Sequence, residues 1–208
     1  GGNAIRCVGK YLYEKGIVPR REMKIETANG INEVTVYSFN GKVNSASVNL
    51  GKAELAGENI PCIWKEDKIV NKPATIGGKE YKVTLVNLGN PHCVVFSEKV
   101  DAVDVETVGP LFENCEYFPE RINAEFIRVV NRVTIKMRVW ERGNGETWSC
   151  GTGAAAAVVA AVLNGYCDRD TNITVKLRGG DLVVNYHSDG EVELMGSVKT
   201  VYEGRLEI

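Results

Sequence analysis

The stretch CGTGAAAAVVAAVLNG, Cys150 to Gly165, has a counterpart at the start of the chain, where Gly1 to Gly16 reads GGNAIRCVGKYLYEKG. In each, a small residue and a glycine precede a polar residue that can cap a helix, Thr152 or Asn3, and a glycine closes an apolar run at the same spacing. Such residues are typical of the two ends of a helix. The sequence therefore predicts two helices at equivalent positions in two related halves.

The first turns of these helices are predicted anion sites. A helix N-terminus has N–H groups without intrahelical partners and a partial positive charge, so it binds carboxylates and lowers the pKa of a thiol placed on it. Cys150 stands at this point in the second copy, where the first copy has Gly1. We expect the two turns to hold one anion between them and the Cys150 thiolate to be stabilised.

The rest of the chain is rich in short strands. A short helix is expected over Val105–Glu113, and Lys72–Gly78 is interpreted as a linker. Strands are predicted over residues 23–27, 33–38, 42–50, 81–86, 93–96, 124–130, 132–140, 173–177, 182–187, 192–195 and 201–208. Because a helix does not follow every strand, the pattern favours an α+β fold of two pseudo-symmetric halves, each a mostly antiparallel sheet wrapped on a central helix.

Composition excludes several classes of partner. The chain has 208 residues, with 25 basic and 27 acidic residues interspersed and a net charge of −2, so it predicts no nucleic-acid surface and no membrane anchor. The apolar run Ala154–Leu163 is about half of the roughly 20 residues that cross a membrane, and no signal peptide is recognised. A small polar substrate and a cytoplasmic location are expected.

The spacing of the cysteines also favours a cytoplasmic location. No CxxC spacing typical of zinc or redox sites occurs, so free thiols in a reducing compartment and no metal are predicted. The four cysteines expected to be plain buried residues are Cys62, Cys93, Cys115 and Cys167.

Two segments carry candidate chemistry. GNPH, Gly89–His92, places an amide and an imidazole in one tight loop, although a histidine in a loop is more often structural than catalytic. ERGNGETWSCGTGA, Glu141–Ala154, combines an acid, a base, glycines and a thiol beside the second helix. The alternative interpretation is a glycine-rich hairpin with Glu141 and Arg142 as solvated charges.

Four motifs occur in a characteristic order and at characteristic separations: the opening GNAIRC, GNPHCVVF, RINAEF and ERGNGETWSCGTGA. Together they resemble the diaminopimelate epimerase family, and LRGGDLVV and VYEGRLEI extend the match. The resemblance implies interconversion of LL- and meso-diaminopimelate in lysine and peptidoglycan synthesis. It also implies two cysteines, one from each half, that remove and return the α-proton on opposite faces of the substrate. Neither a metal nor pyridoxal phosphate is implied, because the two helix N-termini stabilise the developing charge.

The resemblance assigns roles by position. Cys150 matches the second catalytic cysteine, and His92 and Glu141 match the residues that assist proton transfer at the thiols. The turns that grip the α-carboxylate match Gly2, Asn3, Gly151 and Thr152. The residues that read the distal end of the substrate match Asn90, Asn123, Glu141 and Arg142, with Arg142 pairing its carboxylate.

The chain departs from the family at its start. The family pattern CGNxxRC has its first catalytic cysteine where this chain has Gly1, and Cys7 matches only the later cysteine. The family also has an N-terminal stretch before this motif. We therefore expect an inactive fragment with an incomplete first half, residues 1–78 with a return strand at 199–208, and a complete second half, residues 79–198. Exposed sheet edges in the first half predict self-association, such as a homodimer.

Two other functions fit the residues less closely. A proline or hydroxyproline racemase would share the fold, but Asn3 and the Glu141–Arg142 pair favour diaminopimelate. A non-catalytic domain that binds an amino acid or a protein is the alternative from another class, supported by Gly1 because a single thiol cannot perform two-base chemistry.

Overall fold

The computed structural model describes residues 2–27 and 30–198, with side chains from 5–27 and 31–198. The chain divides into two compact units, residues 1–49 with 195–208, and residues 50–194. Strands β3 (Lys42–Lys52) and β12 (Glu191–Ser197) each begin in one unit and end in the other. Each unit has its own strands and its own long helix.

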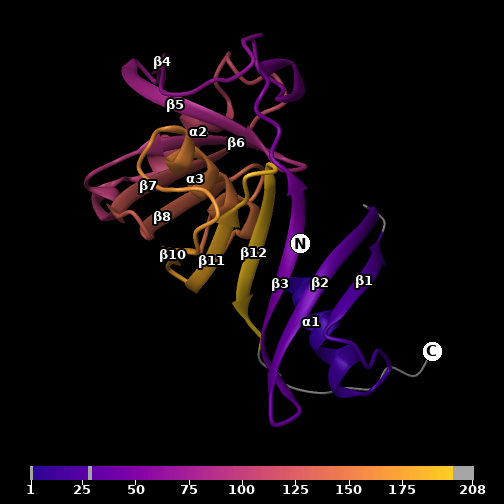
Figure 1. Cartoon of the computed structure of the whole chain (residues 1–208). Coiled ribbons are helices and arrows are strands. Elements are labelled where there is room, and N and C mark those ends of the chain that lie inside the picture. The colour runs from indigo at the N-terminus through magenta and orange to yellow at the C-terminus, as the bar shows by residue number, and fades with distance from the viewer. Residues whose placement is uncertain (1, 28–29, 199–208) are drawn as a thin grey trace, which may run out of the picture. The chain divides into compact units, whose positions relative to one another are not determined.

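The smaller unit packs α1 (Gly2–Glu14) on an antiparallel sheet of β1 (Glu22–Thr27), β2 (Gly30–Phe39) and β3 (Figure 1). The helix approaches β2 closely at Gly9, where an added Cβ would lie 2.9 Å from Val34 Cγ1. Lys10 Nζ donates to Val43 O at 2.9 Å, and Glu14 accepts from Val43 N–H at 2.8 Å, so the helix is also tied to the far strand. The described core of this unit therefore lies between one helix and one sheet face.

The larger unit contains a mixed sheet in the order β12-β11-β10-β8-β7-β6-β5-β4, with β9 paired to β8. Neighbours are antiparallel within the hairpins, whereas β6 with β7 and β8 with β10 are parallel. The strands are β4 (Lys72–Ile76), β5 (Lys79–Asn87), β6 (Pro91–Phe96), β7 (Asn123–Asn131), β8 (Thr134–Glu141), β9 (Gly145–Thr147), β10 (Ile173–Leu177) and β11 (Gly180–Tyr186). Short 3-10 turns occupy Gly57–Asn59 and Val100–Ala102.

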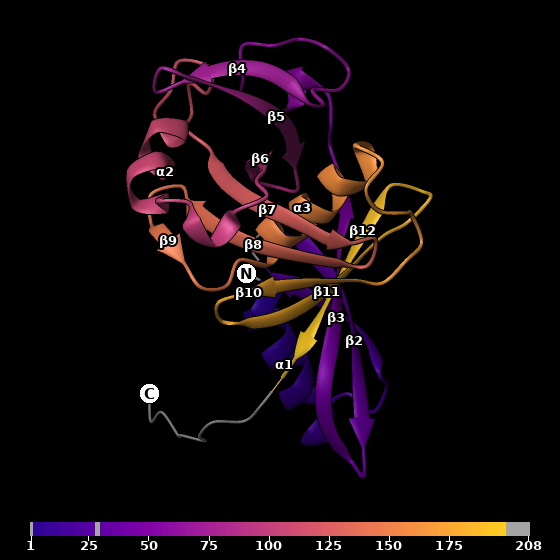
Figure 2. The ribbon, with the colours of Figure 1, turned by 90° about the vertical axis from the view of Figure 1, so that its left-hand side faces the viewer.

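Helix α3 (Gly151–Leu163) is the centre of the larger unit. Every residue from Gly153 to Ala161 is buried, because small alanine side chains let β5, β6, β7, β8, β10 and β11 approach the helix. The other face of β7 and β8 is covered by α2 (Val105–Glu113) (Figure 2). The α+β class and the sheet wrapped on a central helix are confirmed, and both long helices have 13 residues.

One prediction about this unit was wrong. Lys72–Gly78 is not a linker: Lys72–Ile76 forms β4, and Gly77 and Gly78, with φ of 59° and 79°, make the tight turn into β5. Pro73 is unusual in a strand, since proline interrupts a sheet ladder. It is tolerated because β4 stands last in the strand order, where one edge needs no donor.

The predicted halves and the observed units differ in extent. Residues 50–78, assigned above to the first half, lie in the larger unit, because Ile60, Ile69 and Ile76 belong to its core. The predicted return strand 199–208 lies outside the described residues. Whether each half is a domain in its own right stays a prediction.

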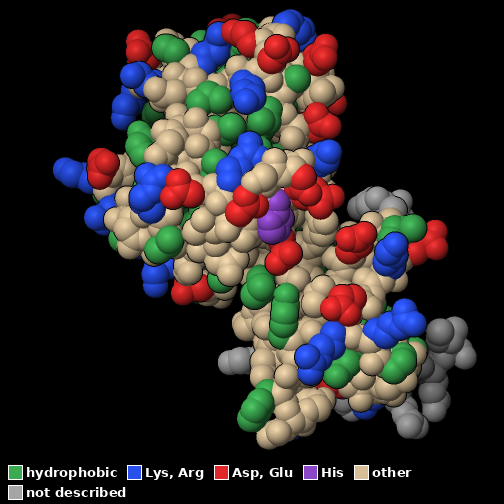
Figure 3. Space-filling model, in the orientation of Figure 1, with side chains coloured by type: hydrophobic (Ala, Val, Ile, Leu, Met, Phe, Trp, Pro, Cys, Tyr) green, Lys and Arg blue, Asp and Glu red, His purple; other side chains and the backbone are tan. Residues whose placement is uncertain are grey.

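The surface agrees with the charge pattern of the sequence. Basic and acidic side chains alternate over the face shown in Figure 3 rather than gathering into a stripe. Within the described residues, no helix is both long and apolar enough to cross a bilayer.

Candidate active site

The candidate site lies on the sheet face that covers α3, where strand alternation places polar side chains at one end of an apolar surface. In strands, every second residue faces the same side. Val94, Ile127 and Val139 face α3 within the core. One or two steps along these strands, the same alternation brings His92, Asn123, Glu125 and Glu141 to this face. His92 pairs in register with Asn123, and Glu141 follows Trp140, which pairs with Ala124. Three strands therefore present a compact polar group beside the start of α3.

The GNPH loop joins this group to the helix. Gly89, with φ of 91°, makes the turn between β5 and β6. Asn90 Nδ2 donates to Thr152 Oγ1 at 3.2 Å, and Asn90 Oδ1 lies 2.8 Å from His92 Nε2. The other ring nitrogen, His92 Nδ1, lies 2.6 Å from Glu125 Oε1. His92 is completely buried, so both nitrogens are held by protein oxygens.

Asn123 connects the loop to the glycine-rich turn. Its Nδ2 donates to Pro91 O at 2.9 Å, and its Oδ1 accepts from the Arg142 N–H at 2.8 Å. In this structure the Asn123 amide therefore binds backbone groups of two segments. Arg142 Nη1 donates to Glu120 O at 3.2 Å, and Glu141 accepts from the Thr147 hydroxyl.

Cys150 is the N-cap of α3. Its Sγ accepts from the Gly153 N–H at 3.3 Å, and its carbonyl accepts the first helical bond from Ala154 N–H. The prediction that Thr152 caps this helix was wrong: Thr152 lies in the first turn, 3.8 Å from the sulfur through Oγ1. The N–H groups of Gly151 and Thr152 precede that first helical bond, so helix geometry leaves them for an external acceptor.

Burial reverses the expected ionisation of Cys150. The desolvated sulfur, together with the negative charges of Glu125 and Glu141, raises the pKa of the Cys150 thiol to about 12, although the Gly153 N–H and Thr152 lower it. The helix N-terminus lowers the pKa of the thiol through the Gly153 N–H, as expected, but burial and the two carboxylates outweigh this effect. Desolvation outweighs the helix field because the sulfur is enclosed beside two carboxylates. Cys150 is a thiol at neutral pH.

Sequence reasoning missed Glu125. This residue is completely buried, and burial raises the pKa of its carboxyl group, against the lowering effect of His92. The sequence contains a signal for it: in AEFIRVV, Glu125 lies on the same strand face as Ile127 and Val129, so a carboxylate occupies a core position of the predicted strand.

The remaining predicted residues belong to the smaller unit or lie outside the described residues. Gly2 and Asn3 are in the first turn of α1, and Gly1 and the predicted cap by the Asn3 side chain are outside the described part of the chain. No cluster of three or more side chains suited to a metal occurs in residues 2–27 and 30–198. Of the cysteines expected to be buried, Cys62, Cys93 and Cys167 are buried, whereas Cys115 is half-buried.

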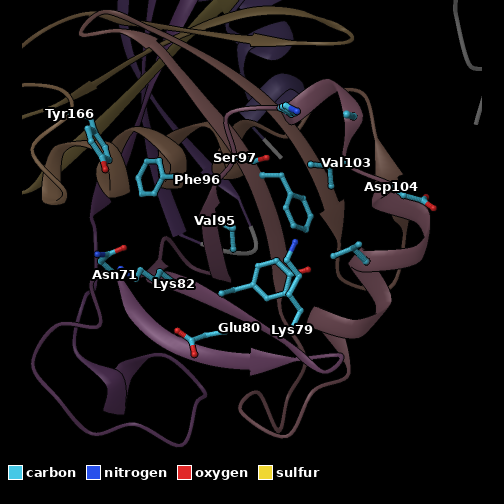
Figure 4. A pocket seen from close by; sticks show the side chains of 15 residues that line it. Asn71, Lys79, Glu80, Lys82, Val95, Phe96, Ser97, Val103, Asp104 and Tyr166 are labelled. Atoms are coloured by element: carbon cyan, nitrogen blue, oxygen red, sulfur yellow. The ribbon is translucent and has the colours of Figure 1, made fainter.

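A pocket of about 690 Å³ in the larger unit is separate from this group (Figure 4). Its lining includes Val95 and Phe126. These two residues point to the opposite sheet face from His92, Val94 and Glu125, which is the face covered by α2. None of the predicted site residues lines it.

Comparison with known proteins identifies the family. Residues 84–201, which include the whole polar group and α3, match the family described as diaminopimelate epimerase. A curated diaminopimelate epimerase from Acetivibrio thermocellus is 44% identical over 208 residues, covering 100% of this chain and 74% of that protein. The chain belongs to the diaminopimelate epimerase family. A second relative with the same name, from Bacillus licheniformis, is 44% identical over the whole chain and 73% of its own length.

Solved structures agree with this family at the level of fold. A probable proline racemase from Agrobacterium radiobacter superposes with a TM-score of 0.67 at 16% identity, covering 95% of this chain and 64% of that one. A predicted epimerase from Pseudomonas aeruginosa gives 0.66 at 16% identity, covering 99% and 74%. The architecture of this diaminopimelate epimerase family member is thus shared with racemases and epimerases of distant sequence.

Proposed function

We propose that this chain supplies the Cys150 side of a cofactor-independent epimerase that interconverts LL- and meso-diaminopimelate. The observation that carries the proposal is the thiol at the N-cap of α3, next to two N–H groups, from Gly151 and Thr152, that precede the first helical bond. Those donors suit the substrate α-carboxylate, and the sulfur beside them suits the α-carbon.

In this scheme Cys150 acts as the acid in one direction and as the base in the other. As acid, its S–H bond breaks and a C–H bond forms at the α-carbanion, leaving a thiolate; the reverse step restores the thiol. Binding of the α-carboxylate at the helix N-terminus stabilises the charge that develops during abstraction. A thiol at neutral pH is the form that returns the proton.

The roles of the other residues are proposals of the same kind. His92 and Glu141 assist proton transfer at the thiols, and Asn90 orients Thr152 through the bond at 3.2 Å. Gly2 and Asn3 form the equivalent carboxylate-binding turn at α1. Arg142, with Asn123 at its backbone N–H, recognises the distal carboxylate.

Deuterium exchange tests the function. The chain, extended at its N-terminus by the matching segment of the Acetivibrio thermocellus relative with cysteine at position 1, is incubated with LL-diaminopimelate in heavy water under reductant. We expect α-deuterium incorporation and meso product, both lost in Cys150→Ala and kept in Cys115→Ala, since Cys115 is half-buried outside the site. Absence of exchange in the extended protein would refute the proposal.

The distant structural relatives suggest a second arm of this assay. The Agrobacterium radiobacter neighbour is named a probable proline racemase, but its 16% identity supports only the fold. Exchange of proline but not of diaminopimelate would assign the racemase reaction instead. Tight diaminopimelate binding without exchange would assign a binding protein.

A homodimer is proposed on separate grounds. In the smaller unit, β1 is the first strand of the order, and Ile31 and Phe39 on β2 are 69% and 71% exposed. Apolar surface near a sheet edge favours association. Sedimentation equilibrium should show a dimer that Phe39→Ser weakens; a monomer at all concentrations would contradict this proposal.

A further inference from the structure

Glu125 is a completely buried carboxylate of the larger unit to which the proposed mechanism gives no role. It sits one step deeper in the sheet than His92 and Asn123, between Val94 and Val139, its partners in register on β6 and β8. A carboxylate in such an apolar layer is costly unless it is paired. Its Oε1 contacts His92 Nδ1 at 2.6 Å, whereas its buried Oε2 has no hydrogen-bond partner among the described residues.

The same carboxylate lies next to Cys150. A Cβ built on Gly153 would be 3.0 Å from Glu125 Oε1 and 3.0 Å from Cys150 Sγ. The oxygen and the sulfur therefore flank one point on the first turn of α3. In this low-dielectric setting, a negative charge on Glu125 acts strongly on the ionisation of the sulfur.

Hydrogen-bond geometry fixes how many protons Glu125 and His92 share. Asn90 Nδ2 donates to Thr152, which turns Asn90 Oδ1 toward His92 Nε2, so that ring nitrogen carries a hydrogen. A second hydrogen must lie between His92 Nδ1 and Glu125 Oε1, whether bound to nitrogen or to oxygen. In both cases the Glu125–His92 pair is neutral overall. Loss of that second proton to solvent leaves the pair with one negative charge.

We propose that Glu125 is a positioning residue for Cys150: it shares one proton with His92 beneath the sulfur, and its charge keeps Cys150 a thiol whenever that proton is lost. A Cys150 thiolate and a negatively charged Glu125–His92 pair are then not present at the same time. Cys150 can ionise during turnover only while the pair holds its proton. This inference rests on the proposed function for its meaning in catalysis, but its test does not use substrate.

The titratable groups around Glu125 are few. His92 on β6, Glu141 on β8 and Cys150 at α3 face it, and Cys93, whose thiol pKa is raised chiefly by burial and further by Glu125, lies on the neighbouring strand. Glu141 also raises the pKa of the Cys150 thiol, so the charge of Glu141 must stay constant when variants at residue 125 are compared. Substitutions at residue 125 leave Glu141 and its bond to Thr147 in place.

The test measures how fast iodoacetamide alkylates Cys150 in the 208-residue chain, followed by peptide mass spectrometry between pH 7 and 9.5. Because the thiolate is the reactive form, Glu125→Gln should speed alkylation of Cys150 at least tenfold at the upper end of this range, where the pair has lost its proton, the effect of about one pH unit. His92→Gln removes the group that neutralises Glu125, so it should slow the reaction at the lower end of this range, where the unaltered pair still holds its proton. A structural role alone would not shift the two variants in opposite directions.

Other residues of the chain serve as controls for this test. Cys93 is completely buried and reports unfolding, while exposed Cys7 should react equally in all variants. Glu146→Gln removes another carboxylate with little exposure, one paired with Arg138 at 2.8 Å, and should leave the Cys150 rate unchanged. If Glu125→Gln exposes Cys93, Glu125→Met, an apolar side chain of similar length, replaces it.

The outcomes separate the two proposals. Unchanged Cys150 alkylation in folded Glu125→Gln, or equal shifts in Glu125→Gln and His92→Gln, would overturn the role of Glu125. Opposite shifts without deuterium exchange in the extended protein would support the role of Glu125 and reject the epimerase. Deuterium exchange without any shift in the rate of Cys150 alkylation would support the epimerase and reject the role of Glu125.

Discussion

At the scale of single residues, Gly153 is where the thiol and the buried carboxylate meet the helix. Replacing a helical glycine by alanine ordinarily stabilises a protein by about 0.5–1 kcal/mol. Here the added Cβ would crowd Cys150 Sγ and Glu125 Oε1, both at 3.0 Å. We expect Gly153→Ala to lower the free energy of unfolding in urea by about 1–3 kcal/mol. A stabilised variant would show that the two side chains are not held at this point.

At the scale of elements, α2 holds β8 through a close glycine contact. A Cβ at Gly109 would lie 2.4 Å from the ring of Trp140, and Trp140 cannot turn aside without losing the bond from its Nε1 to Glu113 Oε2 at 2.6 Å. Gly109→Ala should therefore destabilise the larger unit by about 3 kcal/mol in urea unfolding.

The matched control lies on the same helix. Glu106 is exposed in the first turn of α2, so Glu106→Ala should change the free energy of unfolding by only about 0.5 kcal/mol. Equal effects of the Gly109 and Glu106 substitutions would mean that α2 does not pack on Trp140 as described.

At the scale of the whole molecule, the buried carboxyl of Glu125 makes stability depend on pH. Burial raises its pKa above the ordinary value of 4.5, so the folded state binds this proton more tightly than the unfolded state does. That stabilising contribution is complete below the ordinary value and is lost as the pH rises through the raised pKa. The free energy of unfolding of Glu125→Gln should therefore increase relative to that of the unaltered chain between pH 4 and 8, in urea titrations. If the free energies of unfolding of the two proteins changed in parallel with pH, a raised pKa of Glu125 would be contradicted.

Much of the fold follows from local signals. The apolar run after Cys150 and the glycine at 165, with φ of 81°, mark the bounds of α3, and Val105–Glu113 forms α2 over its predicted range. Turn residues such as Asn40 and Gly41, both at positive φ, separate β2 from β3 as predicted. These features depend on each residue's own backbone preferences, which neighbours along the chain reinforce.

The chemistry of the site depended on contacts that no local pattern contains. That Pro73 lies in an edge strand, that Glu125 lies between His92 and Cys150, and that Cys150 itself caps α3 follow from pairings between distant segments, such as parallel β6 and β7. The sequence by itself determined the helices, the hairpins, the fold class and the family. Only the tertiary structure decided that Cys150 is a thiol, because its pKa depends on burial and on charges brought from other strands.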